Sequence, residues 1–377
     1  MRIGLNLLFL IPGVVGGTET YAVGLVRALA RVDPASEFLV FLSSEASSLA
    51  LTDAPNVRRV VCPVKAVLRS VRYLWEQAVL PFQLPTYKLD LLHSLGYVGP
   101  LFTKCPQVVT IPDLNFQVLK GVMPEPKRRI LEFFSVRSAR RAARVITLSH
   151  SSKAQIVDSL GLDSDKVIVT HLAAPQETEQ TSWEVVRAHY GLPDRFVVAI
   201  GGASAHKNLP RLIEAFDQVA HHLPHSLLLL GQLPQEVNGL LRAPASAANR
   251  LLLPGYVPER DKRAILRHAD LLVMPSLYEG FGLPVVEAQQ EGVPVACSQA
   301  SSLPEVAGEG ALLFDPLSVE QMAAAIQRCL TDMPLRERLI RLGTENLKRF
   351  DWERTAQETL NAYRLALQDN VARRGRL

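Results

Sequence analysis

Short apolar runs alternate with amphipathic segments along the whole chain, and this alternation limits the possible folds more than any other feature. The runs expected as strands are residues 3–8, 38–42, 57–61, 89–92, 108–111, 145–148, 167–169, 196–200, 227–230, 251–253, 271–274, 293–296 and 311–314. Because they lack strict alternation of apolar and polar residues, they suit strands buried on both faces, as in parallel sheets. The intervening segments, such as 209–219, carry apolar residues at helical spacing. The pattern predicts a doubly wound α/β fold.

Two segments repeat the same architectural step of strand, glycine-bearing turn and helix. One runs from residue 3 through Gly16 and Gly17, and the other runs from residue 196 through Gly201 and Gly202. This step opens nucleotide-binding units. A chain of 377 residues also favours about two domains. We therefore expect two Rossmann-like domains with parallel sheets that face a central cleft.

The domain boundaries follow from composition. A polar, proline-containing segment separates the two steps and suits a linker, and Asp351 is a plausible N-cap for a last helix. The expected parts are an N-terminal domain at 1–174, a linker at 175–192, a C-terminal domain at 193–350 and a helix at 351–377 that returns to the N-terminal domain.

Composition excludes several classes of protein. Hydrophobic residues make up 48% and charged residues 21%, as in ordinary globular domains. The net charge of +4 is too small to indicate nucleic-acid binding. The four cysteines are widely spaced, so we expect reduced thiols, and no apolar run is long enough to span a membrane. Residues 1–15 contain Asn6 and Pro12 and lack a signal-peptide cleavage site, so a cytoplasmic protein is expected.

Residues 275–288, PSLYEGFGLPVVEA, carry the most chemical information. They follow a buried strand, and Pro284 suits the first position of a helix. The amides of Phe281, Gly282 and Leu283 would then point out of the helix N-terminus, which favours an anion such as a diphosphate. Glu279 would lie in the loop before the helix and Glu287 in about its first turn.

A structural interpretation of the two glutamates stays open. Glu287 could simply complement the helix dipole, and Glu279 could be a solvated loop charge. If the whole stretch were helical, the two carboxylates would lie ~12 Å apart. They would then contact different parts of a ligand.

Several motifs resemble one known family. EGFGLPVVEA, with seven residues between Glu279 and Glu287, resembles the E-x7-E signature of the retaining glycosyltransferases of family 4. The segment 16–19, GGTE, resembles the family's GGxE loop, and 202–209, GASAHKNL, resembles the segment that holds its donor lysine, here Lys207. Segments 292–295, 302–306, 314–316 and 350–352 match later parts of the pattern. The resemblance covers nearly the whole chain and implies the GT-B fold.

The resemblance also implies roles for individual residues. Lys207 would neutralise the pyrophosphate of a nucleotide sugar, and Gly16 and Gly17 would let the backbone approach it. Glu287 would hold the ribose hydroxyls, and Glu279 would lie beneath the transferred sugar. Charge that builds on a departing diphosphate needs fixed amides and a cation. These groups would act without a metal or other cofactor.

The sequence departs from the family pattern in two places. Members commonly carry His-Asp after the strand that corresponds to 108–111, whereas this chain has Pro112 and Asp113. Asp113 could orient a sugar or acceptor hydroxyl, or it could cap the following turn. His206 also precedes Lys207 where the family often has arginine.

Residues 120–144 form a basic stretch with interleaved apolar residues. Their lysines and arginines outnumber their glutamates, which gives a local net charge of about +6. Residues 65–80 add Arg69, Arg72 and Trp75. A basic amphipathic helix is typical of a membrane-surface element. The alternative is an ordinary helix that packs its apolar face on the sheet and leaves its arginines in solvent.

Two other motifs point away from further activities. The D-x-D pattern of Asp163 and Asp165 lies in a polar turn, so we interpret it as a turn and not as a metal site. No P-loop and no intact GxGxxG occurs, which disfavours an ATPase and a dinucleotide-dependent dehydrogenase.

The resemblance therefore implies a retaining, metal-independent glycosyltransferase that uses a nucleotide-diphospho-sugar. The N-terminal stretches most resemble the family's mannosyltransferases of O-antigen and polysaccharide pathways, so GDP-mannose is the donor guess. Its expected acceptor is a lipid-linked or polysaccharide glycan, and its expected place is the cytoplasm or the inner face of the cytoplasmic membrane. A GT-B-fold sugar-nucleotide epimerase and a catalytically weak nucleotide-sugar-binding protein remain as alternatives.

Overall fold

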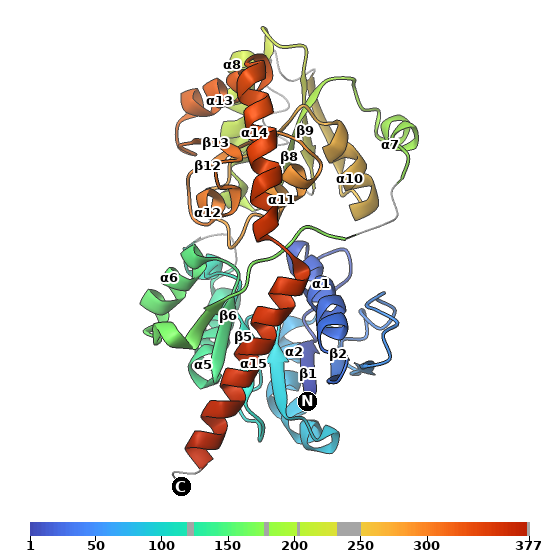
Figure 1. Ribbon diagram of the computed structural model, residues 1–377, viewed down its shortest axis with the longest axis vertical. Coiled ribbons are helices and arrows are strands. Elements are labelled where there is room, and N and C mark those ends of the chain that lie inside the picture. Colours follow the sequence, from blue (N-terminus) through green and yellow to red (C-terminus); the bar gives the residue numbers. More distant parts are fainter. Residues whose placement is uncertain (119–123, 177–180, 202–203, 232–249, 375–377) are drawn as a thin grey trace. The chain divides into compact units, whose positions relative to one another are not determined.

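The computed structural model describes residues 1–118, 124–176, 181–201, 204–231 and 250–374. The chain divides into two compact units (Figure 1). The first unit comprises Met1–Ala173 together with Asp351–Leu377, and the second comprises Ala174–Phe350. The predicted boundaries at residues 174 and 350 lie within one residue of this division.

The first unit is built on a parallel sheet in the order β3-β2-β1-β4-β5-β6-β7. Its strands are β1 (Arg2–Leu7), β2 (Glu37–Leu42), β3 (Val57–Val61), β4 (Leu91–Ser94), β5 (Gln107–Thr110), β6 (Arg144–Thr147) and β7 (Val167–Val169). Its helices are α1 (Gly17–Val32), α2 (Arg69–Ala78), α3 (Leu80–Gln83), α4 (Asn115–Val118), α5 (Glu125–Arg141), α6 (His150–Leu160) and α15 (Trp352–Arg374), with short 3-10 turns at Leu84–Tyr87 and Ser164–Lys166.

Helix α15 belongs to the first unit although it ends the chain. It packs on α1 and on strands β5 and β6. A Cβ placed on Gly24 of α1 would lie 2.3 Å from the indole of Trp352, so this glycine lets the two helices approach closely. The Asp351 carboxylate accepts the Arg354 amide at 3.1 Å and caps the helix.

The second unit contains a parallel sheet in the order β10-β9-β8-β11-β12-β13. Its strands are β8 (Phe196–Ile200), β9 (Ser226–Leu230), β10 (Leu251–Gly255), β11 (Leu271–Met274), β12 (Val295–Ser298) and β13 (Ala311–Phe314). Its helices are α7 (Trp183–Tyr190), α8 (Leu209–Ala220), α10 (Glu259–His268), α11 (Leu283–Gln290), α12 (Leu303–Ala307), α13 (Val319–Thr331) and α14 (Met333–Asn346), with 3-10 turns at Ala205–Lys207 and Leu347–Arg349.

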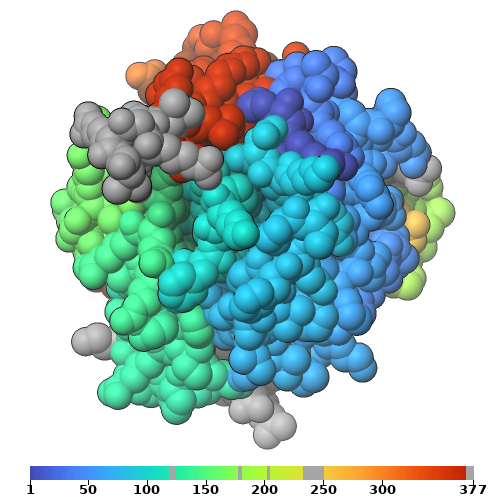
Figure 2. Space-filling view, turned by 90° about the horizontal axis from the view of Figure 1, so that it is seen from below, coloured from blue at the N-terminus to red at the C-terminus, as the bar shows by residue number. Residues whose placement is uncertain are grey.

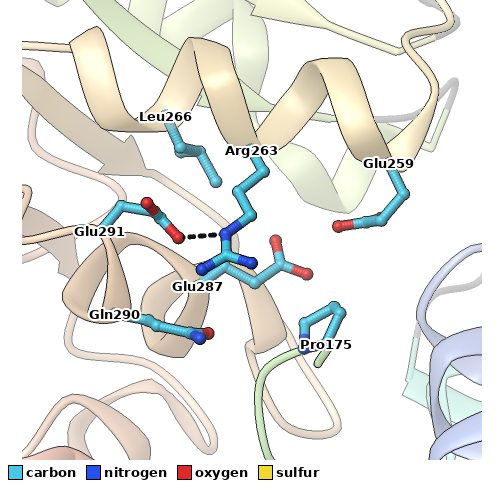
Figure 3. Close-up of a pocket in the computed structure, with 7 residues that line it drawn as sticks. All are labelled: Pro175, Glu259, Arg263, Leu266, Glu287, Gln290 and Glu291. Atoms are coloured by element: carbon cyan, nitrogen blue, oxygen red, sulfur yellow. Dashed lines mark hydrogen bonds and ion pairs between the residues drawn. The ribbon is translucent and has the colours of Figure 1, made fainter. Parts of the chain in front are cut away.

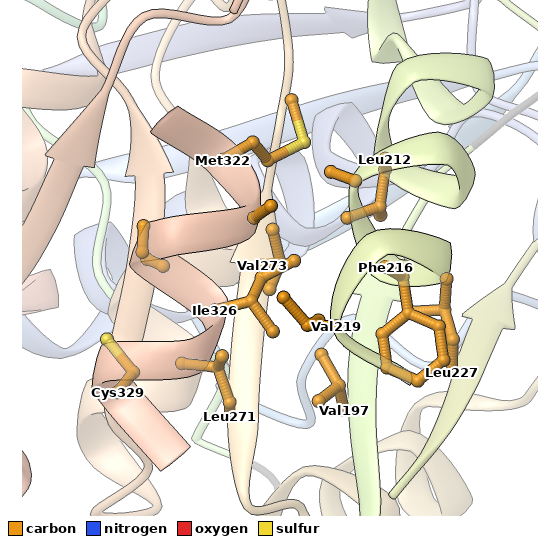
Figure 4. Close-up of a cluster of buried hydrophobic side chains, with 14 of the residues drawn as sticks. Val197, Leu212, Phe216, Val219, Leu227, Leu271, Val273, Met322, Ile326 and Cys329 are labelled. Carbon is orange, nitrogen blue, oxygen red and sulfur yellow. The ribbon is translucent and has the colours of Figure 1, made fainter. Parts of the chain in front are cut away.

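Helices α8 and α13 cover one face of this second sheet. Phe216 of α8 and Ile326 of α13 meet strand residues such as Val197 and Val273 in a fully buried cluster (Figure 4). Burial of both strand faces explains why the strand sequences are continuous apolar runs. This packing makes the strand ends a rigid platform for the loops that follow them.

The predicted linker at 175–192 is partly wrong. Residues 177–180 lie outside the described residues, but 183–190 form α7, which packs on α10. Trp183 stacks on His268 with ring centroids 4.0 Å apart. The aromatic anchor makes this segment part of the second unit, a role that its polar composition conceals.

Each sheet reverses its strand order once, at β1/β4 in the first unit and at β8/β11 in the second. Ligands of open parallel sheets bind outside the carboxyl ends of the strands at such a point. The Gly16-Gly17 loop follows β1, and the segments that carry Lys207 and Glu279 follow β8 and β11. The topology therefore places predicted site residues at a switch point within each unit.

Candidate functional site

Lys207 lies in the 3-10 turn between β8 and α8. The next residue, Asn208, adopts a left-handed conformation (φ 56°) and is buried. Its side-chain amide donates to the carbonyls of Pro275 at 3.1 Å and Pro316 at 2.7 Å. The Leu277 amide also donates to the carbonyl of His206 at 2.8 Å. These bonds fix the lysine loop to the loop that precedes α11. The adjoining Gly202 lies outside the described residues.

Lys207 and Glu279 form an ion pair. The Nζ atom of Lys207 lies 2.7 Å from Oε1 of Glu279. The side chains are 20% and 13% exposed, so solvent can still reach the pair. The Glu279 amide donates to Ser301 Oγ at 2.8 Å, and Ser302 Oγ donates to the Glu279 carbonyl at 2.9 Å. Glu279 is therefore a fixed, paired carboxylate and not the solvated loop charge of the structural interpretation.

The N-terminus of α11 is shaped by Gly282, which has φ 106°. A Cβ at this residue would also lie 2.6 Å from the side chain of Leu303, so both backbone conformation and space require glycine. Phe281 and Leu283 are buried, and Phe281 packs edge-on against Phe350. Their side chains serve packing, which leaves backbone amides as the groups of this turn that suit an anion. The helix begins at Leu283, so Pro284 is its second residue, whereas the sequence predicted it as the first.

Glu287 lies in the second turn of α11, and not in the first. It is buried, and Lys262 Nζ donates to its Oε1 at 2.9 Å. Burial raises the pKa of Glu287, and the ammonium of Lys262 opposes that rise. Since Glu279 precedes the helix, the separation expected for a continuous helix does not apply. Glu287, Glu259 and Arg263 line a small pocket of the second unit (Figure 3).

His206 takes the place of the arginine that the family pattern favours. Burial lowers the pKa of His206, and the nearby ammonium of Lys207 lowers it further. The histidine is therefore neutral at pH 7 and supplies no second positive charge beside Lys207.

The glycine loop of the first unit follows β1. Gly16 caps α1 with φ 56° and ψ −132°, a conformation available only to glycine. Gly17 is the first residue of the helix, and both glycines are exposed. The Glu19 carboxylate accepts the Gly13 amide at 2.8 Å and closes the loop. The GGxE segment thus exposes backbone to an approaching ligand.

Asp113 follows β5 in the first unit. Its Oδ1 accepts the Tyr97 hydroxyl at 2.9 Å and the Asn115 amide at 3.0 Å. The second bond is the turn-capping contact that the sequence left open. Tyr97 has φ 59°, and its hydroxyl restricts the carboxylate. An orienting role for Asp113 toward substrate stays a prediction.

His93 has a structural role in the first unit. It is fully buried, with Nδ1 2.7 Å from the Tyr363 hydroxyl and Nε2 2.7 Å from Thr110 Oγ1. Tyr21 also bonds Thr110 at 2.9 Å. Burial lowers the pKa of His93 to about 3, so the ring is neutral. The network joins β4 and β5 to α1 and α15.

The predicted site residues thus fall into two sets. Gly16, Gly17 and Asp113 belong to the first unit, and the rest belong to the second. Within the second unit Lys207 and Glu279 come together, whereas Glu287 is held by a different partner. Asp163 caps a 3-10 turn by accepting the Asp165 amide, so the D-x-D pattern is a turn, as interpreted.

The basic stretch differs from the expectation in detail. Lys120 lies outside the described residues, and α5 covers Glu125–Arg141. Arg128 and Arg129 pair with Glu125, and Arg144 pairs with Asp369. Glu125 is already counted in the local net charge of the stretch, so only the pair with Asp369 lowers the predicted positive charge.

Helices α2 and α5 and the residues just before α2 expose several large apolar side chains. On α2, Arg72 is only 7% exposed, whereas Leu74 is 66% exposed. The Tyr73 and Phe134 rings lie 5.6 Å apart, so the two helices are neighbours. The large apolar side chains exposed here are Val67, Leu68, Val71, Leu74, Ile130 and Phe133, which we call the α2–α5 surface. The expectation that Arg72 adds to a basic surface is wrong. Helix α5 follows the alternative in part, because Leu131 and Val136 pack on the core while Ile130 and Phe133 stay exposed.

A wide groove lies at the amino ends of β5 and β6, opposite the strand ends that carry the predicted site residues of the first unit. It has a volume of about 940 Å³ and is lined by Phe82, Phe102, Lys104, Arg140 and Arg141, among others. The Arg141 guanidinium lies 4.6 Å from the Phe102 ring centroid. This end of the first unit, where α15 finishes, faces the viewer in Figure 2. No residue of the predicted site lines the groove.

Comparison with known proteins identifies both units. Residues 15–177 match the model described as Glycosyltransferase Family 4, and residues 187–346 match Glycosyl transferases group 1. O-antigen chain mannosyltransferase B of Escherichia coli is 30% identical over 68% of this chain and 70% of its own length. The serotype-specific mannosyltransferase WbdA of the same species is 26% identical over 72% of this chain, which spans about a third of WbdA.

Solved structures share the architecture. Sucrose-phosphate synthase of Thermosynechococcus elongatus superposes with a TM-score of 0.75 over 97% of this chain and 98% of its own, at 21% identity. Anabaena HepE in complex with UDP-glucose superposes with a TM-score of 0.73 over 96% of this chain and 100% of its own, also at 21% identity. These likenesses establish the GT-B arrangement of each unit's sheet and helices. The chain therefore belongs to glycosyltransferase family 4 and is a glycosyltransferase of the hexosyltransferase type.

Proposed function

We propose that this glycosyltransferase moves a mannosyl residue from GDP-mannose to a lipid-linked or polysaccharide glycan, with retention of configuration and without a metal. The names of two relatives, an O-antigen chain mannosyltransferase and a serotype-specific mannosyltransferase, support this choice of sugar and acceptor class. The main support for a donor site is the Lys207–Glu279 pair. It lies where the strand order reverses at β8 and β11, in the loops that include the glycine-capped start of α11.

In the proposed reaction, Lys207 and the amides at the start of α11 stabilise the charge on the departing diphosphate. The bond between the sugar's anomeric carbon and the phosphate oxygen breaks. The acceptor oxygen bonds to that carbon on the same face, and its proton passes to the leaving phosphate oxygen. This route requires no enzymic base, which fits the proline at position 112 where the family often has histidine.

A donor panel tests the proposal. The whole chain is incubated with GDP-mannose, UDP-glucose and UDP-N-acetylglucosamine in the presence of EDTA, and released nucleoside diphosphate is measured. We expect release from GDP-mannose in EDTA and its loss in Lys207→Met. Release only after a divalent cation is added would contradict metal independence. Binding of nucleotides without turnover of any donor would contradict the proposed donors.

We also propose that the α2–α5 surface rests on an anionic membrane, where a lipid-linked acceptor would be found. No helix among the described residues has the length and apolar character needed to cross a bilayer, so attachment would be peripheral. Exposed Lys65, Arg69, Lys127 and Arg137 flank the apolar side chains in sequence. Each cation near an anionic surface contributes ~1 kcal/mol, and the apolar side chains add burial in the headgroup region.

Co-sedimentation with vesicles tests this surface. Vesicles that contain phosphatidylglycerol should bind the protein, and vesicles of phosphatidylcholine alone should bind it much less. Leu74→Glu should reduce binding several-fold, because it places a charge in the apolar patch. Val185→Glu is the matched control, since Val185 is 58% exposed on α7 of the second unit, close to the 66% of Leu74. Equal loss in both variants would contradict the assignment to α2 and α5.

A further inference from the structure

Two clusters of ion pairs join α10 to α11 in the second unit. Lys262 of α10 lies 2.9 Å from Glu259 and 2.9 Å from Glu287. One residue on, Arg263 lies 2.5 Å from Glu291, which is one turn beyond Glu287. The Lys262 and Glu287 side chains are 15% and 5% exposed, so this pair is largely buried. Because desolvation of a buried charge pair can offset its attraction, such a pair is weak evidence for a purely stabilising role.

The geometry of the Glu287 carboxylate is asymmetric. The Nζ atom of Lys262 lies 2.9 Å from each of its oxygens, but only Oε1 accepts a hydrogen bond from it. Oε2 is buried and has no hydrogen-bond partner among the described residues. The ammonium compensates the charge of Oε2 but leaves this oxygen without a hydrogen bond of good geometry. A ligand hydroxyl would supply the missing donor.

Burial and the neighbouring charges act on the Glu287 carboxylate in opposite directions. Burial raises the pKa of Glu287, the ammonium of Lys262 lowers it, and Glu259 adds to the rise. For Lys262, burial lowers the pKa, but Glu287 and Glu259 outweigh that effect and raise it. Arg263 also faces Glu287 from α10, but its bond goes to Glu291 (Figure 3). Lys262 is thus the cation that bonds Glu287 and keeps it able to accept hydrogen bonds.

We propose that Lys262 is a positioning residue for the donor nucleotide, which holds the Glu287 carboxylate so that Oε2 accepts a ribose hydroxyl. This rests on the proposed function, in which Glu287 binds the ribose of a nucleotide sugar. Without Lys262 the buried carboxylate takes up a proton more readily. The protonated acid has fewer acceptor sites and loses the orientation that the ammonium imposes.

Isothermal titration of GDP and UDP into the whole chain, from pH 5.5 to 8.5, tests this role. Wild type should bind GDP, the nucleotide of the proposed donor, with an affinity that depends less on pH than that of Lys262→Met. Lys262→Met should bind at least tenfold more weakly at pH 5.5 and recover as the pH rises and Glu287 ionises. Lys262→Arg should retain most of the affinity. Arg267→Met is the matched control, because Arg267 lies on the same helix and pairs with Glu291; it should bind within about twofold of wild type.

Each outcome decides the question. If wild type binds neither nucleotide, the proposed function fails, and the inference fails with it. If wild type binds and Glu287→Gln loses affinity while Lys262→Met matches wild type at every pH, only the inference is overturned. A pH-independent loss in Lys262→Met that Lys262→Arg does not restore indicates a merely structural residue and also overturns it. Unchanged affinity in Glu287→Gln would show that Glu287 does not bind the ribose, and this also overturns the inference. Thermal unfolding of each variant confirms that it is folded.

Discussion

Replacing Glu279 with glutamine should tighten nucleotide binding while it slows transfer. In the free protein the Glu279 carboxylate occupies Lys207 at 2.7 Å. A diphosphate that binds Lys207 brings negative charge within roughly 5 Å of this carboxylate. At an effective dielectric constant of ~20, two unit charges at that distance repel by about 3 kcal/mol. The pair is partly exposed, so about half of this is screened. We expect GDP or UDP to bind about tenfold more tightly to Glu279→Gln.

Lys207→Met should have the opposite effect. A hydrogen bond to a charged group contributes about 1.5–3 kcal/mol, so its loss weakens nucleotide binding by roughly 10- to 150-fold. Titration calorimetry measures both variants, and initial rates of donor turnover show whether Glu279→Gln is slower. The control is Glu320→Gln, an exposed carboxylate on α13 of the same unit. Weaker binding in both Glu279→Gln and Lys207→Met would refute the reasoning, because it would mean that Glu279 serves to hold Lys207 in place.

Three further predictions concern stability. Buried His93 is neutral, whereas the ring in the unfolded chain titrates near pH ~6.5, so the free energy of unfolding falls as the pH drops below that value. At a pH of about 5.5 the loss is about 1.4 kcal/mol. Urea unfolding at pH 7.5 and 5.5 should therefore show a smaller difference in the free energy of unfolding for His93→Gln than for wild type. Gly24→Ala drives a methyl group into Trp352, which should lower the free energy of unfolding by about 1–3 kcal/mol as measured by urea. At Gly16 there is room for a methyl group, but alanine does not readily adopt the backbone conformation found there. Gly16→Ala should therefore lower the free energy of unfolding by about 1–3 kcal/mol through backbone strain alone. An unchanged midpoint of urea unfolding would contradict the assigned conformation.

The strands were largely predictable because most are buried on both faces. Phe196–Ile200 and Leu271–Met274 have the predicted bounds. The strand predicted at 89–92 is found at Leu91–Ser94 instead. Hydropathy places polar His93 outside a buried strand, whereas hydrogen bonds to Tyr363 and Thr110 satisfy it inside. Such partners lie far away in the sequence and leave no local signal.

Helix α2 could not be predicted correctly for the same reason. Its amphipathic pattern indicates that the charged side faces solvent, yet Arg72 and Glu76 are buried. Glu76 accepts the Asn6 amide at 3.2 Å and lies 3.7 Å from Arg72. Burial raises the pKa of Glu76, and Arg72 opposes the rise. The inverted orientation depends on a residue of β1 that is 70 positions away.

The candidate site was predictable where it follows strand order. Lys207 and Glu279 follow neighbouring strands of a doubly wound sheet, so their proximity follows from topology once the strands are identified. Lys262 was missed, because it reaches Glu287 across two helices and belongs to no local motif. The sequence indicated Gly282 only as part of a motif, whereas its φ of 106° and the nearby Leu303 side chain explain why glycine is required there.

The central claim is that this chain breaks the bond between a sugar and a nucleoside diphosphate with retention of configuration. Proton NMR of slow donor hydrolysis tests it without an acceptor, because the anomer released first is visible before mutarotation mixes the two forms. We predict that GDP-mannose in the presence of EDTA first releases the anomer that the donor carries. First release of the opposite anomer, or no release from any nucleotide sugar that binds, would contradict the account.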